Sequence, residues 1–214
     1  EKSQAQLSKI IQNSIKLLEE KFSPDVIVVA SNTPSLMLDV TTKKILDVKP
    51  PLKDAKKQSK TKQIGILATK GAINSTGLTK HIKKNNFSKS FKIFKINASD
   101  LVEIVESGKF ISNKKYSQKI IKNTLDEILS QNNIDTITLS STHLLFLKPL
   151  LKKQYPKINF IDPANIVAEK VFLKIKNKQS EKNSLKIFVT GNTRTFQMKL
   201  NKIGIKNKVN LLSF

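Results

Sequence analysis

Apolar residues near the start of the chain recur at a helical spacing. Five of them lie three or four positions apart: Leu7, Ile11, Ile15, Leu18 and Phe22. This spacing predicts an amphipathic α-helix that ends before Pro24, because proline disfavours helix in the residue before it. The same reasoning predicts a second amphipathic helix over residues 116–129 and a short one over residues 101–105.

Short runs of β-branched and other apolar residues predict β-strands. They cover residues 26–30, 64–68, 91–96, 136–139, 158–161 and 186–189. Residues 47–62, with Pro50, Pro51 and several lysines, predict a connector. Strands that alternate with helices indicate parallel sheets with crossover helices on both faces. The sequence therefore predicts an α/β fold.

Small polar side chains follow three of the predicted strands. They are Ser31, Asn32 and Thr33 after the first strand, Thr69 after the second, and Ser141, Thr142 and His143 after the fourth. In open α/β sheets, ligands bind beyond the carboxyl ends of the strands. Hydroxyls, an amide and free backbone amides suit a small anionic ligand. The same residue types often cap helices at such loops, and the spacing alone favours capping.

The chain has only two histidines, and each has two interpretations. His143 follows a strand and has the residue type that serves as a general acid or base near neutral pH. A lone histidine is nevertheless more often a structural hydrogen-bonding residue. His81 stands in a lysine-rich stretch and is predicted to lie on the surface. Asp162 precedes a proline and is predicted to cap a helix that begins at Ala164.

Composition excludes several classes of protein. The 214 residues carry a formal net charge of +23, but Arg194 is the only arginine and the lysines spread along the whole chain. This distribution favours a solvated cationic surface over specific nucleic-acid recognition, which prefers the arginine fork. Without cysteine, the chain has no disulfide, thiolate metal site or thiol nucleophile. No membrane span, nucleotide-binding glycine loop or metal-ligand cluster is predicted, so we expect a cytoplasmic protein without a metal.

Several segments resemble the aspartate/glutamate racemase superfamily, most closely glutamate racemase. Val-Val-Ala-Ser-Asn-Thr-Pro-Ser at 28–35 resembles the family's Val-Val-Ala-Cys-Asn-Thr-Ala-Ser, and Leu-Ser-Ser-Thr-His at 139–143 resembles its Leu-Gly-Cys-Thr-His. Residues 65–71 and 101–108 are similar to its Gly-x-x-Ala-Thr-x-Gly and Leu-Val-Glu-x-x-Glu-x-Gly segments. With 161–164 and 188–191 in the same order, the resemblance covers essentially the whole chain.

The resemblance implies two Rossmann-like lobes around a cleft and a cofactor-independent two-base isomerase that interconverts L- and D-glutamate for peptidoglycan biosynthesis. It places Ser31 and Ser141 at the two thiol positions, with His143 assisting the second. It gives Asn32, Thr33, Thr69 and Thr142 to substrate binding. Glutamate or aspartate is the implied partner, and a homodimer is compatible with it. We expect residues 1–60 and 164–214 to form one lobe and residues 61–163 the other.

This sequence departs from the family pattern where the chemistry is implied. Serine occupies both thiol positions, Leu144 and Leu145 replace the family's Tyr and Pro, and the family's N-terminal Asp-Ser-Gly and Pro-Tyr-Gly motifs would lie before Glu1. A serine hydroxyl is far less acidic than a thiol, whose pKa is about 8.5. Two interpretations remain: an inactive or strongly impaired racemase, or a non-catalytic binder of a small acid.

Overall fold

The computed structural model describes residues 4–37, 44–178 and 180–213. Its helices are α1 Gln4–Phe22, α2 Asn32–Met37, α3 Leu52–Gln58, α4 Lys70–Ile73, α5 Thr76–Lys84, α6 Ser99–Glu106, α7 Lys109–Ser112, α8 Lys114–Gln131, the 3-10 helix η1 Thr142–Leu147, α9 Lys148–Gln154, α10 Ala164–Ile175 and α11 Thr193–Lys202. Its strands are β1 Ile27–Val29, β2 Ile45–Asp47, β3 Gln63–Ala68, β4 Lys92–Asn97, β5 Thr136–Leu139, β6 Asn159–Ile161, β7 Ile187–Val189 and β8 Val209–Leu211.

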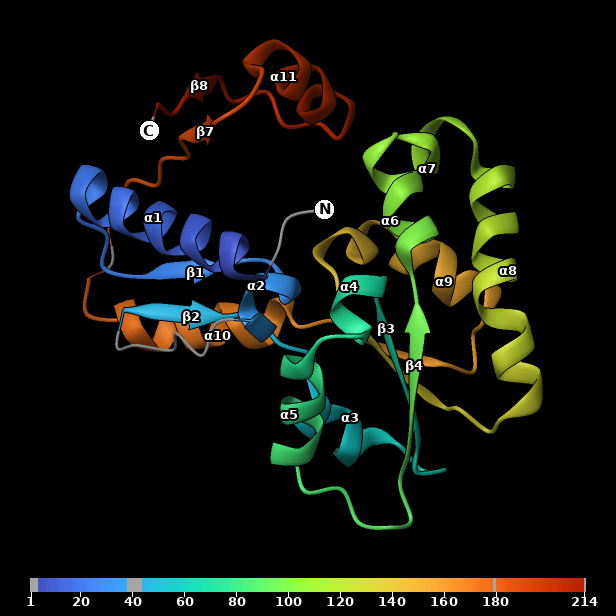
Figure 1. Ribbon diagram of the computed structural model, residues 1–214. Helices are drawn as coiled ribbons and strands as arrows, with labels where there is room; N and C mark the ends of the chain where they lie inside the picture. The colour runs from blue at the N-terminus through green and yellow to red at the C-terminus, as the bar shows by residue number, and fades with distance from the viewer. Residues whose placement is uncertain (1–3, 38–43, 179, 214) are drawn as a thin grey trace.

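Parallel pairing joins the described strands into three sheets. A two-stranded sheet contains β1 and β2, a four-stranded sheet has the order β4-β3-β5-β6, and a further pair contains β7 and β8. Figure 1 shows the first sheet and the four-stranded sheet in separate lobes, with α11 above the space between them. The predicted α/β fold with parallel sheets is confirmed.

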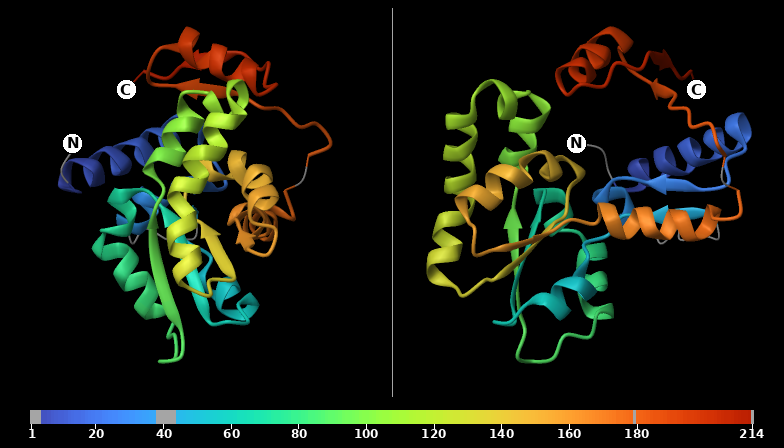
Figure 2. Two further views of the ribbon diagram at one scale, coloured as in Figure 1. Left: turned by 90° about the vertical axis from the view of Figure 1, so that its right-hand side faces the viewer. Right: turned by 180° about the vertical axis from the view of Figure 1, so that it is seen from behind.

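The smaller lobe is a thin sheet covered by one helix on each face. Figure 2 shows α1 on one side of β1 and β2, and α10 on the other. The helical face predicted from the apolar spacing supplies Ile15, which packs with Ile27 of β1 and Ile45 of β2. The first predicted helix therefore forms because its apolar stripe covers this sheet.

The larger lobe is built around β3 and β5, which lie in the middle of the four-stranded sheet. Successive β3 side chains point to opposite faces, as the pleat of a strand requires. Leu67 packs into the larger cluster under α6, α8 and α9, while Ile66 and Ala68 pack on the other face. Because both faces of these strands are covered, residues 64–68 of β3 and all four residues of β5, Thr136 and Thr138 included, are buried.

The predicted connector at residues 47–62 is partly wrong, because it contains part of β2 and all of α3. Leu52 and Ala55 of α3 are spaced one helical turn apart and are both buried. Leu52 packs with Ile66 of β3, and Ala55 with Ile161 of β6, so α3 covers the four-stranded sheet. The division into 1–60 with 164–214 and 61–163 stays a proposal.

His81 is not a free surface residue, which corrects the interpretation given above. Its side chain is half-buried, and Nε2 lies 2.8 Å from the carbonyl oxygen of Pro50, where the chain leaves the smaller lobe. Burial lowers the pKa of the His81 imidazole, although the Pro50 contact opposes this, and the charge of Lys49 lowers it further. His81 therefore ties α5 to the segment that joins the lobes.

The C-terminal segment folds as β7, α11 and β8. Asn192 caps α11 by accepting a hydrogen bond of 2.8 Å from the backbone N–H of Thr195. The ring of Phe188 in β7 lies 5.1 Å from that of Phe22 at the end of α1. Within the described ranges, no helix has the length and apolar character needed to cross a bilayer.

Candidate functional site

Two of the polar strand ends lie side by side because of the strand register. Leu67 of β3 pairs with Leu139 of β5 in parallel, and the Ser140 amide donates to the Leu67 carbonyl oxygen at 2.8 Å. Thr69 and Ser141 stand two residues beyond this pair on adjacent strands. Their side chains therefore leave the same edge of the sheet, where α/β proteins bind ligands.

Thr69 itself has a structural partner. Its hydroxyl oxygen accepts a hydrogen bond of 3.4 Å from the Ala72 amide and caps α4. The capping interpretation therefore holds for this residue, as it does for Asp162, whose Oδ1 accepts from the Ala164 amide at 3.1 Å. A hydroxyl that accepts from a backbone amide still has its own proton to donate.

The polar cluster after β1 lies at the beginning of α2. Ser31 is exposed, Asn32 is the first helical residue, and Thr33 is half-buried. Ser35 fixes the helix: its hydroxyl donates to the Val29 carbonyl oxygen and accepts from the buried Val48 amide, both at 3.1 Å. These bonds hold α2 against the carboxyl ends of β1 and β2.

Asn32 is the least satisfied polar residue of this cluster. Its side chain is 3% exposed, and neither Oδ1 nor Nδ2 has a hydrogen-bond partner among the described residues. A buried amide without partners costs about 1–3 kcal/mol, so natural proteins rarely retain one without a reason. Asn32 therefore has donor and acceptor capacity that a ligand would satisfy.

The two clusters come from different lobes that meet through helices. α2, which carries Asn32, packs against α4 and α5, and α4 begins directly after Thr69. Figure 1 shows α2 and α4 next to one another at the junction of the lobes. No hydrogen bond between described residues joins Ser31 to Ser141, and the packing of α2 on α4 and α5 sets how the two sides lie.

Ser141, His143 and Glu106 form a line of polar contacts on the larger lobe. Ser141 is 8% exposed, and its Oγ lies 3.2 Å from Nδ1 of His143. Nε2 of His143 lies 3.3 Å from Oε1 of Glu106 in α6. In the neutral tautomer that carries its proton on Nε2, Nδ1 accepts from the serine hydroxyl, and the Nε2–H group lies within ion-pair distance of the carboxylate. Thr142, between them, is half-buried at the start of η1.

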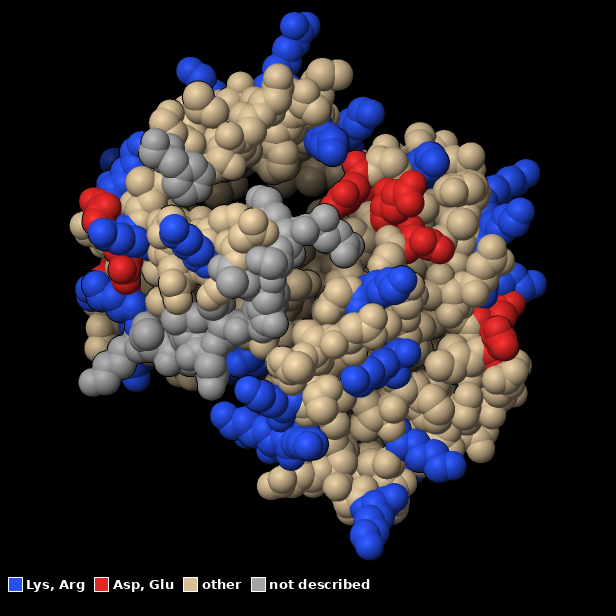
Figure 3. Space-filling model, in the orientation of Figure 1, with Lys and Arg blue, Asp and Glu red and all other residues tan. Residues whose placement is uncertain are grey.

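Sequence reasoning did not identify Glu106 as a site residue. It lies 37 positions before His143, and the contact forms because η1 packs on α6. The feature of the sequence that pointed to Glu106 is its position in segment 101–108, which resembles a racemase helix. Figure 3 shows acidic side chains over α6, whose acidic residues are Asp100, Glu103 and Glu106, beside a hollow of the surface.

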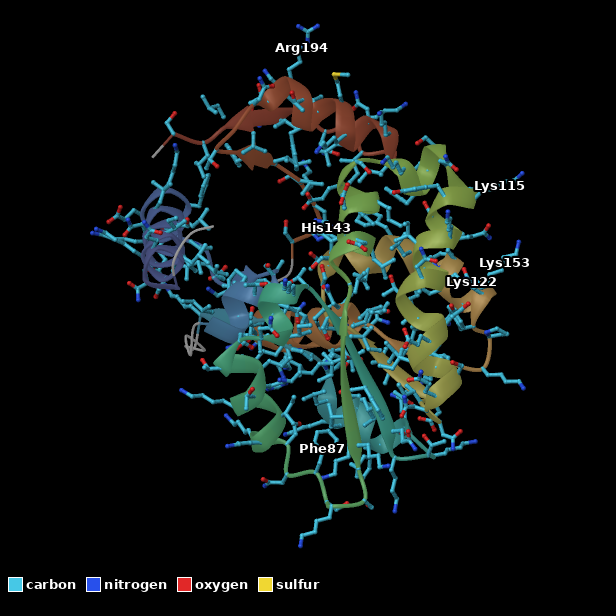
Figure 4. The ribbon with its side chains drawn as sticks, turned by 45° about the vertical axis from the view of Figure 1, so that its right-hand side comes forward. Phe87, Lys115, Lys122, His143, Lys153 and Arg194 are labelled. Atoms are coloured by element: carbon cyan, nitrogen blue, oxygen red, sulfur yellow. The ribbon has the colours of Figure 1, made fainter. Side chains whose placement is uncertain are left out.

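A cavity of about 520 Å³ lies between α11 and the larger lobe. His143 and Glu106 lie on its wall, and the opposite wall is the α11 face that carries Phe196 and Lys199. Figure 4 shows His143 on the side of the larger lobe that faces α11. Most of the other lining side chains are apolar: Val105, Phe110, Ile111, Phe146, Leu200 and Ile203.

Comparison with protein-family models gives no match. Sequence comparison finds the glutamate racemase of Persephonella marina, 30% identical over 197 residues that are 89% of this chain and 73% of the relative. The glutamate racemase of Buchnera aphidicola is 35% identical over 186 residues, which are 82% and 71% of the two chains. The solved glutamate racemase of Escherichia coli, in complex with L-glutamate and an activator, matches with a TM-score of 0.80 at 20% identity over 100% of this chain and 83% of that one.

Together these findings define the class of protein. The parallel α/β fold is shared with the solved glutamate racemase of Escherichia coli and with the solved aspartate racemase of Picrophilus torridus. The chain belongs to the glutamate racemase family, because its sequence is at least 30% identical to these two racemases over more than two thirds of their length. The family resemblance predicted from the sequence motifs is confirmed.

Proposed function

We propose that this chain is a glutamate-racemase-type protein that binds an acidic amino acid where its two lobes meet. Ser31 and Ser141 would occupy the positions of the two proton-transferring groups, and His143 would assist Ser141. Asn32, Thr33, Thr69 and Thr142 would hold the substrate. Membership of the family supports glutamate as the ligand, as does the L-glutamate bound to the related Escherichia coli protein.

The unsatisfied amide of Asn32 is the observation that carries this proposal. It offers two N–H donors on Nδ2 and an acceptor on Oδ1 in a buried position. An α-amino acid presents the complementary pair, since its carboxylate accepts and its ammonium donates. Such a ligand would satisfy both atoms of the amide at once and remove the cost of their burial.

The charge of the chain favours the same class of ligand. Its net charge of +23 attracts small anions toward the surface. Figure 3 shows lysines over both lobes, so this attraction is general and does not select a position. The site would therefore obtain its specificity from short-range hydrogen bonds at Asn32 and the strand-end hydroxyls.

Serine at both thiol positions would leave binding intact but slow racemisation. A two-base racemase needs one group ionised in the resting state to remove the Cα proton while the opposite group supplies one. A thiol, with a pKa of about 8.5, is partly ionised near neutral pH, and a serine hydroxyl has no comparable ionised fraction. Each unit of pKa difference is worth about 1.4 kcal/mol, so we expect racemisation to be strongly impaired.

Calorimetric titration with L- and D-glutamate tests the binding claim. We expect saturable binding to the full-length protein and a loss of about tenfold or more in affinity for Asn32→Ala, which removes the buried amide. Asn165→Ala is the matched control, because Asn165 is an exposed amide on α10. Absence of heat at millimolar ligand, or equal binding by Asn32→Ala, would contradict the proposal.

A further inference from the structure

Ser141 stands in a chain of contacts that can activate its hydroxyl as a nucleophile. Its Oγ lies 3.2 Å from His143 Nδ1, and the other ring nitrogen lies 3.3 Å from the Glu106 carboxylate. A hydroxyl within reach of a base, with the base oriented by a third group, is the arrangement that activates serine for covalent catalysis. The negative charge of the carboxylate beside Nε2 favours the tautomer with its proton on Nε2, which leaves Nδ1 free to take the hydroxyl proton.

A serine hydroxyl is suited to nucleophilic attack, although it is poorly suited to removing the Cα proton. Racemisation requires a base that is already ionised before the substrate reacts. A serine nucleophile loses its proton to the imidazole only as its bond to the substrate forms, so no ionised resting state is needed. Serine in place of cysteine therefore impairs racemisation but is compatible with nucleophilic catalysis.

The cavity beside this line of contacts has His143 and Glu106 on its wall but not Ser141, and it suits an apolar ligand better than glutamate. At about 520 Å³ it has the size of a site for a small organic molecule. Its wall is largely apolar, with the rings of Phe110, Phe146 and Phe196, while His143 and Glu106 provide polar groups on one side. Lys199 and Lys202 add positive charge from α11. An apolar or aromatic group fits this wall better than a short dicarboxylate.

We propose that Ser141 is a covalent nucleophile toward esters with an apolar acyl group, which gives this chain an esterase-type activity distinct from racemisation. The acyl group would lie in the cavity beside His143. Oγ would attack the ester carbonyl while Nδ1 takes the hydroxyl proton. The bond from the carbonyl carbon to the leaving oxygen then breaks, and the imidazolium returns the proton to the departing alcohol. Water, activated by the same imidazole, would release the acid and restore Ser141.

A fluorophosphonate probe tests the nucleophile directly. Attack would form an Oγ–P bond and release fluoride, and the added mass is read by intact-mass spectrometry and peptide mapping. A phosphonate is preferred to an activated ester as the first probe, because the many lysines of this chain would react with the ester and raise the background. We expect one adduct, on Ser141, and none on Ser141→Ala.

Matched variants separate an activated serine from a merely accessible one. His143→Ala should label about 10²-fold more slowly or worse, with part of the rate restored by added imidazole. Glu106→Gln should lower the rate less, and Glu106→Asp should recover part of it. Ser112→Ala, which removes an exposed hydroxyl on α7, should label normally. Release of p-nitrophenol from p-nitrophenyl butyrate should follow the same order.

Two results would overturn the proposal: a folded wild-type protein that acquires no adduct on Ser141, or labelling of Ser141 at the same rate with and without the His143 imidazole. Because His143→Ala retains the hydroxyl, the second comparison holds even where Ser141→Ala fails to fold. The assay contains no glutamate, so its failure would leave the proposed amino-acid site untouched.

Discussion

Gly77 of α5 lies directly against the backbone of Leu36 in α2. A Cβ atom added to Gly77 would fall 1.8 Å from the Leu36 carbonyl oxygen, far inside contact distance. The two residues belong to helices that meet where the lobes join, and α2 carries Asn32 at its first position. The absence of a side chain at Gly77 therefore sets how closely the two halves of the candidate site approach.

Gly77→Ala should separate α2 from α5, because neither backbone can yield locally. We expect a loss of about 1–3 kcal/mol in unfolding free energy, as for overpacked cores, and weaker glutamate binding. Urea denaturation and calorimetry measure the two effects. Gly71→Ala is the control: its added Cβ meets nothing within 4 Å, so the helical propensity of alanine should leave stability unchanged or raised by up to about 1 kcal/mol. Equal effects of the two substitutions would contradict this account.

Ser35→Ala should destabilise the smaller lobe. The substitution leaves the buried Val48 amide without its acceptor and removes the bond to the Val29 carbonyl oxygen. Leaving a buried donor unsatisfied costs about 1–3 kcal/mol, which thermal or urea unfolding would detect. Ser14→Ala is the comparison, because the Ser14 hydroxyl bonds to the Ile10 carbonyl on the exposed side of α1 and should cost less than about 0.5 kcal/mol. A neutral Ser35→Ala would show that α2 is held in another way.

His81 should make stability depend on pH. Because burial lowers the pKa of its imidazole in the folded state, the unfolded chain binds the proton more readily. The contribution of His81 to stability is therefore present above the unfolded value of about 6.5 and is lost as the pH falls through the lower folded value. His81→Gln removes this titration but can still donate to Pro50.

Urea unfolding at about pH 7.5 and about pH 5.5 measures this dependence, over the range in which histidine changes charge. We expect the wild type to lose more stability between the two values than His81→Gln does. Subtracting the two slopes cancels the contributions of other titrating groups. An identical slope in both proteins would mean that burial does not lower the pKa of the His81 imidazole in the folded state.

The sequence predicted the elements in which buried positions follow a clear strand or helix pattern. The strand β3 contains a run of small and apolar residues, and β5 alternates β-branched threonine with Ile137 and Leu139. Both strands are buried because both faces are covered, and α1 and α8 carry regular apolar stripes. The helix α3 was missed because only Leu52 and Ala55 face the sheet. The other residues of α3 are polar, three of them lysines, and two prolines precede the helix, so the pattern is that of a connector.

The candidate site was predictable in its residues but not in its contacts. The strand-end serines, Asn32 and His143 were identified from the motifs they share with racemases. The contact of His143 with Glu106 depends on the packing of η1 against α6, and the burial of Asn32 depends on α2 meeting the other lobe. Both are long-range consequences of the fold, which neither periodicity nor spacing can report.

Restoring both thiols is the most direct test of the central claim that Ser31 and Ser141 stand at the two proton-transfer positions of a glutamate racemase site. The measurement is deuterium wash-in at Cα of L- and D-glutamate in D₂O, by NMR or mass spectrometry, for the full-length wild type and for the Ser31→Cys, Ser141→Cys double variant. We predict exchange in the double variant that exceeds the wild-type rate by about 10²-fold or more, since thiols ionise where hydroxyls do not. A folded double variant that binds glutamate yet shows no exchange above the blank would contradict the account.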